Sequence, residues 1–270
     1  MQRREMLFKT GAAALSLSAF PLGWVAAADQ PKAKILYFNR SSGWTHPVAD
    51  RQGKPLAHSE KVLRELGEKH GFEVDCRQDA AVLDGDLDKY DLLAFYTNGM
   101  PFSVKQMQKV LDVVSAGKPC VGFHAASDTG AGPVIEPFLA MLGGAFVGHG
   151  AQQKGRSRVV SPKFPGMEGL GDGFELFEEW YALKNFAKDM HVILMQETKG
   201  MQGDLYRLPP YPGTWARLHG KGRVFYTSLG HREDVWTNPI FQQIILGGLS
   251  WAVGRAQADI TPNLAHLMSH

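Results

Sequence analysis

The sequence contains no long tract of one charge and none of the common fingerprints of nucleotide and zinc enzymes. Its 29 basic and 27 acidic side chains are spread along 270 residues and leave a formal net charge of +2. Because no basic tract is present to follow a phosphate backbone, nucleic acid is not expected as a partner. The zincin motif HExxH, the P-loop motif and a GxGxxG turn followed by a helix are also absent, so no nucleotide cofactor is expected.

The chain also lacks an apolar run long enough to span a membrane. The apolar stretch at 11–22 is shorter than the roughly 20 residues that a spanning helix needs, and Pro21 and Gly23 interrupt it. Arg3 and Arg4 precede this stretch, and three alanines at 26–28 follow it, a pattern typical of a cleaved export signal close to the twin-arginine type. We expect cleavage after residue 28, export by the twin-arginine or Sec route, a periplasmic or secreted protein, and no stable membrane insertion.

The remaining 240 or so residues suit one large α/β domain at 29–258, followed by a loosely attached tail at 259–270. Short apolar runs alternate with amphipathic stretches through the first half, which predicts a doubly wound, mostly parallel sheet with helices on both faces. The expected strands are 34–38, 72–76, 91–96 and 120–123, and the expected helices are 59–69 and 103–116.

The second half is less regular. It contains expected strands at 156–160, 191–197, 214–218 and 223–228, and a helix at 239–253. Cysteine is scarce, and Cys76 and Cys120 are the only two. In the common strand order 2-1-3-4 they lie three strand spacings apart, or roughly 14 Å, which is too far for a disulfide.

Polar side chains follow several of the expected strands, at the edge where open parallel sheets bind ligands. His46 and Asn98 follow the first and third strands, although a surface histidine and an Asn-Gly turn explain them equally well. His124 follows the fourth strand among small residues and has the setting of a nucleophile elbow, but an imidazole there can act as an acid, a base or a metal ligand. His231 repeats the arrangement after the 223–228 strand.

Two further segments offer groups for the same edge. His149 lies between glycines, and Glu179 precedes Trp180 and Tyr181, a combination suited to sugar recognition by stacking and hydroxyl bonding. The alternative for the segment at 178–181 is an edge strand whose glutamate charge is simply solvated. Glycoside hydrolysis by paired carboxylates is the least favoured interpretation, because Glu178 would point to the opposite face from Glu179 in a strand.

With these residues in view, the sequence resembles the ThuA-like (trehalose utilisation) family over nearly all of its mature length. The matching segments are 122–128, 142–144, 179–181, 215–220 and 225–231. The resemblance implies a flavodoxin-like fold of the class I glutamine amidotransferase type, with His124 where those relatives carry a nucleophilic cysteine. Without a thiolate at that position, glutamine amidotransferase activity is not expected.

The resemblance also implies a carbohydrate partner, in particular 3-keto disaccharides and 3-keto glycosides cleaved by elimination or hydrolysis. The expected catalytic residues are His124, Glu179 and His231, with Glu179 or His124 as the base. The enediolate would be stabilised directly or through a divalent metal, whose ligands would be His124, His149, Glu179 and His231. The expected substrate-binding residues are His46, Asn98, Asp128, His149, Tyr181 and Arg232. A non-catalytic sugar-binding module with the same pocket is the alternative, and a homodimer stays open.

Overall fold

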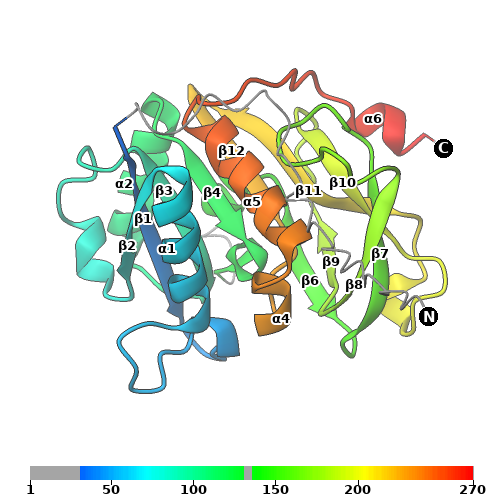
Figure 1. Ribbon diagram of the computed structural model, residues 1–270, viewed down its shortest axis with the longest axis horizontal. Helices are drawn as coiled ribbons and strands as arrows, with labels where there is room; N and C mark the ends of the chain where they lie inside the picture. Colours follow the sequence, from blue (N-terminus) through cyan, green and yellow to red (C-terminus); the bar gives the residue numbers. More distant parts are fainter. Residues whose placement is uncertain (1–30, 131–135, 270) are drawn as a thin grey trace, which may run out of the picture.

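A computed structural model describes residues 31–130 and 136–269, so the expected export signal at 1–28 lies outside the described residues. A long twisted sheet runs through the molecule with helices packed against it (Figure 1). Its strand order is β2-β1-β3-β4-β12-β11-β10-β7-β8, with the short β5 paired to β3. Within the described ranges, no helix has the length and apolar character needed to cross a bilayer.

The first half forms the parallel part of the sheet, and the predicted order 2-1-3-4 is confirmed. Its strands are β1 (Ala33–Ser41), β2 (Phe72–Arg77), β3 (Leu92–Gly99), β4 (Cys120–Phe123) and β5 (Asp128–Thr129). Since β1 and β3 separate β2 from β4, Cys76 and Cys120 are both free thiols, as the strand order predicted.

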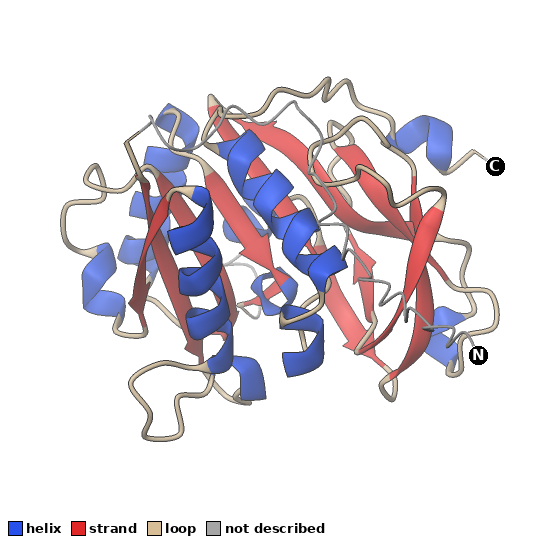
Figure 2. Ribbon diagram, viewed as in Figure 1, coloured by secondary structure: helices blue, strands red, loops and turns tan. Residues whose placement is uncertain are grey.

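Helices cover both faces, which confirms the doubly wound α/β class (Figure 2). Apolar side chains of α1 (His58–His70) and α5 (Pro239–Ala252) pack in one core, and those of α2 (Val104–Ala116) and α3 (Glu136–Leu142) pack in the other. Gly71 ends α1 in the left-handed conformation (φ 76°), and Ser103 caps α2 by accepting a hydrogen bond from the Gln106 amide. The short helical elements are η2 (Pro47–Ala49), η3 (Ala80–Leu83), η4 (His124–Ser127), η5 (Asp204–Tyr206), α4 (Glu233–Trp236) and α6 (Leu264–Leu267).

The second half extends the sheet with antiparallel strands. β12 (Gly222–Thr227) pairs in parallel with β4, after which β11 (Tyr211–His219), β10 (His191–Glu197), β7 (Gln153–Val159) and β8 (Gly173–Glu178) follow in antiparallel order. β6 (Ala145–His149) and β9 (Tyr181–Lys184) form a separate two-stranded sheet. The four expected strands of this half are present. β6, β8 and β9 were not anticipated, because they are short and carry few consecutive apolar residues.

The C-terminal segment is held more closely than the loosely attached tail that the sequence predicted. Both amide atoms of the Asn263 side chain bond to the backbone of Val192, at 2.7 and 3.0 Å. Leu264 is buried in the core that α2 and α3 share. A single polar residue followed by one apolar residue anchors this segment, and such an anchor leaves no periodic signal in a sequence.

Candidate active site

Four buried side chains converge beyond the carboxyl ends of the strands. They are His46, which follows β1, His124 at the end of β4, Glu179 just after β8, and His231 after β12. Each offers one nitrogen or oxygen atom that lies within 4.8 Å of the atoms offered by the other three. We refer to these four residues as the His/Glu cluster. The three expected catalytic residues, His124, Glu179 and His231, therefore lie together.

The backbone at His124 turns sharply, as the elbow pattern predicted. Its φ is 37°, a left-handed conformation that few residues other than glycine adopt. The side chain is fully buried, and its Nδ1 lies 2.6 Å from the carbonyl oxygen of Ser228. Because that carbonyl can only accept, Nδ1 carries the hydrogen and Nε2 of the neutral ring is left with a lone pair. Burial lowers the pKa of His124 to about 4, although Glu179 opposes the shift, so the ring is neutral at pH 7.

The lone pair of His124 points into a group of atoms that repel it. Nε2 lies 3.5 Å from Oε2 of Glu179 and 3.3 Å from Nδ1 of His231, and these two atoms are 3.0 Å apart. His231 can donate its own hydrogen to Glu179, but a lone pair facing a carboxylate needs a cation between them. Burial raises the pKa of Glu179, yet hydrogen bonds and charge from His124 and His231, when these rings carry a proton toward it, outweigh burial and hold that pKa well below its usual range.

These separations fit the edges of a metal coordination sphere. With metal–ligand bonds of about 2.1 Å, tetrahedral ligands stand about 3.4 Å apart. His46 completes the set: burial, followed by the neighbouring imidazoles, lowers its pKa to about 2. Its Nε2 contacts the Tyr181 hydroxyl at 3.2 Å, and its buried Nδ1 has no hydrogen-bond partner among the described residues. Three neutral imidazoles and one carboxylate could hold a divalent transition metal, and suit zinc or iron better than magnesium or calcium.

The comparison with family models matches residues 34–252 to the model described as ThuA, trehalose utilisation. The chain belongs to the ThuA family. No match was found among curated proteins. A solved ThuA-like protein from Bacteroides uniformis is 19% identical, with a TM-score of 0.69 over 90% of this chain and 98% of that one. A second, from Parabacteroides merdae, is 16% identical, with a TM-score of 0.66 over 86% and 94%.

The same fold occurs inside larger enzymes. A β-galactosidase from Bacillus circulans is 13% identical, with a TM-score of 0.53 over 82% of this chain but only 31% of its own. At such low identity these solved structures establish the fold, and the family match connects the chain to trehalose utilisation. What the His/Glu cluster of this ThuA protein can do therefore depends on its own geometry.

The structure revises the expected metal ligands, since His46 takes the place that the sequence gave to His149. Nδ1 of His149 is 3.3 Å from Oε1 of Glu179 and 3.0 Å from the Gly150 carbonyl, and its side chain is 43% exposed. It lies outside the His/Glu cluster and contacts the far oxygen of Glu179. His46 was expected only as a substrate-binding residue, because nothing in the spacing of residues 39–46 indicates how deeply its ring is buried.

Of the other expected binding residues, Tyr181 lies against the His/Glu cluster, and Asn98 and Arg232 are bonded to other parts of the protein. Tyr181 lies in the site, with its ring centroid 3.9 Å from that of His124. Asp128 is half-buried, and burial raises its pKa to about 6 while His149 opposes the shift. Asn98 donates to the backbone of residue 44. Arg232 is bonded instead to Asp234 and Gln152, so its guanidinium is committed away from the His/Glu cluster.

Glu178 supports the site in a way the sequence did not reveal. Its Oε2 accepts hydrogen bonds from the backbone N–H groups of Gly230 and His231 at 2.8 and 3.2 Å, and its Oε1 accepts from the N–H of Glu179 at 2.8 Å. Burial raises the pKa of Glu178 to about 8, in spite of these three donors. One carboxyl group thus fixes the backbone of two cluster residues. The adjacent glutamates were the only signal available in the sequence.

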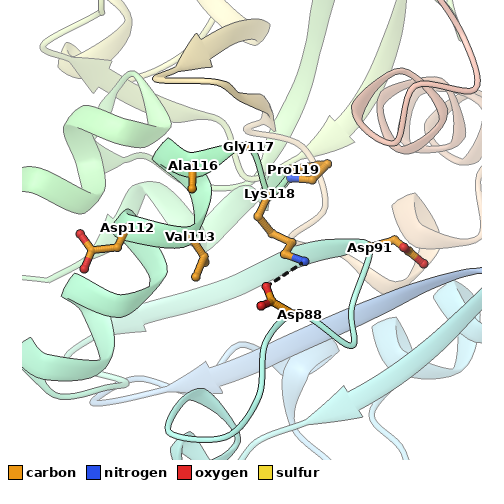
Figure 3. A pocket seen from close by; sticks show the side chains of 8 residues that line it. All are labelled: Asp88, Asp91, Asp112, Val113, Ala116, Gly117, Lys118 and Pro119. Carbon is orange, nitrogen blue, oxygen red and sulfur yellow. Dashed lines mark ion pairs between the residues drawn. The ribbon is translucent and has the colours of Figure 1, made fainter.

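A shallow surface hollow lies at the opposite end of the parallel strands (Figure 3). Its lining includes Lys118 and Pro119, which precede β4, whereas His124 follows that strand. The Lys118 ammonium group is held by the Tyr90 carbonyl at 2.7 Å and by Asp88 at 3.7 Å. Its one cation is therefore already paired, and the hollow lies away from the His/Glu cluster.

Proposed function

We propose that this ThuA-family protein cleaves 3-keto sugars and 3-keto glycosides by eliminating the substituent at C1. The observation that carries the proposal is the convergence of His46, His124, Glu179 and His231 around the unprotonated Nε2 of His124. A ketone at C3 acidifies the proton on C2, and loss of that proton gives an enediolate. The C1–O bond then breaks, the departing oxygen takes a proton, and a C1=C2 double bond conjugated to the ketone is left. Addition of water to that product would complete a hydrolysis.

The His/Glu cluster would stabilise the enediolate. Its donor set fits a divalent transition metal bound by His46, His124, Glu179 and His231. When bound, such an ion acts as a Lewis acid toward the ketone oxygen. The protein's own contribution is to hold three imidazoles in place, with the His46 and His124 rings kept neutral because burial lowers their pKa, and the His124 ring fixed through the Ser228 carbonyl.

Proton transfer is better suited to groups outside the cluster than to its members. His149 contacts Glu179, and the charge of Asp128 interacts with His149 and Tyr181. Glu179 is a weak base because its pKa is depressed, and His124 is fully buried. The pKa of Asp128, near 6, suits a general base at neutral pH, and His149 is exposed beside Glu179. We assign removal of the C2 proton to Asp128 and protonation of the leaving oxygen to His149. This revises the role first expected for Glu179 or His124.

The test is turnover by the mature protein starting at Asp29, with and without metal. We expect the zinc- or iron-loaded protein to release glucose from 3-keto-trehalose and the aglycone from a 3-keto-β-glucoside, and to lose this activity on chelation. Unoxidised trehalose is the matched substrate control and should not react, because its C2 proton is not acidic. Absence of release from both keto sugars by metal-loaded protein would overturn the proposal; binding without release would favour the sugar-binding module. Export would place the activity in the periplasm or outside the cell.

A further inference from the structure

Trp44 is an exposed aromatic side chain at the mouth of the His/Glu cluster. Its relative exposure is 58%, whereas Trp180, Trp215, Trp236 and Trp251 are at most 2% exposed. Trp44 follows β1 in the same loop as His46. A single exposed apolar side chain is common on a protein surface, but this ring lies directly against a buried polar site.

The Trp44 ring is held in a defined position. It stacks on the His231 ring, with centroids 5.8 Å apart and an interplanar angle of 8°, and it meets the His46 ring edge-on at 4.6 Å. Its carbonyl oxygen accepts a hydrogen bond from Nδ2 of Asn98 at 2.8 Å, and the Ser42 amide donates to the Asn98 carbonyl at 3.1 Å. The indole is therefore fixed against two residues of the cluster.

Unpaired polar atoms gather around the same loop. Six buried side-chain atoms have no hydrogen-bond partner among the described residues, and five belong to this region: both amide atoms of Asn39, Oγ of Ser41, Nδ1 of His46 and Oδ1 of Asn98. Buried polar groups in native proteins nearly always have a hydrogen-bond partner, either in the protein or in a bound molecule. Nδ1 of His46 is accounted for by the metal ligand set, and the other four atoms, on Asn39, Ser41 and Asn98, indicate a ligand that brings several hydroxyl groups to the ends of β1 and β3.

We infer that Trp44 is the platform of a pyranose subsite, with Asn98 as a hydroxyl acceptor beside it. A pyranose has an apolar face of C–H groups that packs flat on an indole, while its rim of hydroxyls needs polar partners. The exposed Trp44 ring would pack on the apolar face, and the unpaired polar atoms would bond to the hydroxyl groups. The inference rests on the proposed function for the identity of the reacting sugar, and it assigns that sugar's ring to the Trp44 side of the cluster.

The experiment combines kinetics on 3-keto-trehalose with fluorescence titration by unoxidised trehalose, a non-reacting probe. In W44A we expect KM to rise roughly 10-fold or more with kcat changed much less, and W44F to recover part of the loss. Trehalose should change the tryptophan fluorescence of the wild-type protein saturably, and W44F should abolish that change because the other described tryptophans are buried. Leu218→Ala is the matched control, since Leu218 is 46% exposed near the far end of β11.

The outcomes separate this inference from the proposed reaction. Turnover with a W44A KM within two-fold of wild type would overturn the subsite and leave the reaction standing. No turnover of any keto sugar, together with a trehalose-dependent fluorescence change lost in W44F, would overturn the reaction and support the subsite. A fluorescence change that persists in W44F would overturn the subsite and assign sugar binding to another part of the protein.

Discussion

At the scale of single residues, the tautomer of His124 determines what the site can bind. The Ser228 carbonyl fixes the hydrogen on Nδ1, and the resulting lone pair on Nε2 faces Glu179 and His231. An elbow residue that carried a thiol would direct a nucleophile to the same place. Here the imidazole offers a nitrogen lone pair that could bind a metal ion, so metal binding is the first property to measure.

The variant His124→Asn isolates that ligand atom. Asparagine tolerates positive φ and can donate an N–H toward Ser228, but it cannot replace Nε2. We expect zinc affinity to fall by roughly 100-fold or more and turnover to be lost, while the melting temperature in chelator changes by only a few degrees. Calorimetric zinc titration and thermal melts measure both. His149→Asn is the control, and unchanged zinc affinity in His124→Asn would exclude His124 as a ligand.

At the scale of elements, the end of β3 positions the loop that carries Trp44 and His46. Gly99 closes this strand with φ 62°, and a Cβ there would lie 1.9 Å from the Ser42 carbonyl oxygen. Gly43, in the loop itself, has φ 110°, but a Cβ added to it would meet no atom within 4 Å. An alanine at either position would strain the backbone, but only an alanine at Gly99 would also clash with a neighbouring atom.

We expect Gly99→Ala to displace the loop and Gly43→Ala to add strain alone. Each substitution should cost on the order of 1–3 kcal/mol of unfolding free energy because of its positive φ. Only Gly99→Ala should also weaken zinc binding and the trehalose-dependent fluorescence change. Urea unfolding and the two titrations test this. Equal effects of both variants on binding would show that strand β3 does not set the position of the loop.

At the scale of the whole molecule, the site joins the two halves of the sheet. His46 and His124 come from the parallel half, Glu179 follows the antiparallel strand β8, and His231 follows β12 between them. Glu178 links the end of β8 to the backbone after β12. Because Glu178 joins these two parts of the fold, its protonation state should affect the free energy of unfolding of the whole protein.

The raised pKa of Glu178 gives a pH dependence with a definite sign. Burial moves it from 4.5 to about 8, so the folded protein holds this proton more tightly than the unfolded chain does. Its stabilising contribution is complete below pH 4.5 and is lost as the pH rises through about 8. Relative to Glu178→Gln, wild-type protein in chelator should lose stability between about pH 5 and 8, by at most about 1.4 kcal/mol per pH unit.

Urea unfolding of both proteins across that range measures the difference. Glu175→Gln is the control, because Glu175 lies on the same strand with its side chain in solvent and should not alter the slope in this window. Parallel curves for wild type and Glu178→Gln would show that Glu178 is ionised in the folded protein, with its three backbone donors dominating over burial.

The sequence by itself determined the parallel half and the edge where the site lies. Alternating apolar runs and amphipathic stretches are local signals, and they predicted β1 to β4, α1 and α2 closely. Because the carboxyl ends of parallel strands share one edge, His46, His124 and His231 could be placed at that edge from their positions after strands alone. The small residues around His124 likewise predicted its sharp turn.

Only the tertiary structure decided which groups complete the site. Glu179 reaches the cluster because β7 and β8 pair antiparallel to the sheet, and their short strands carry little periodicity. The same packing placed His46 inside the cluster, left His149 outside it, turned Arg232 away and exposed Trp44. These outcomes depend on contacts between residues far apart in the chain, such as His46 and Tyr181, whereas sequence patterns report only on neighbours within a few turns or strands.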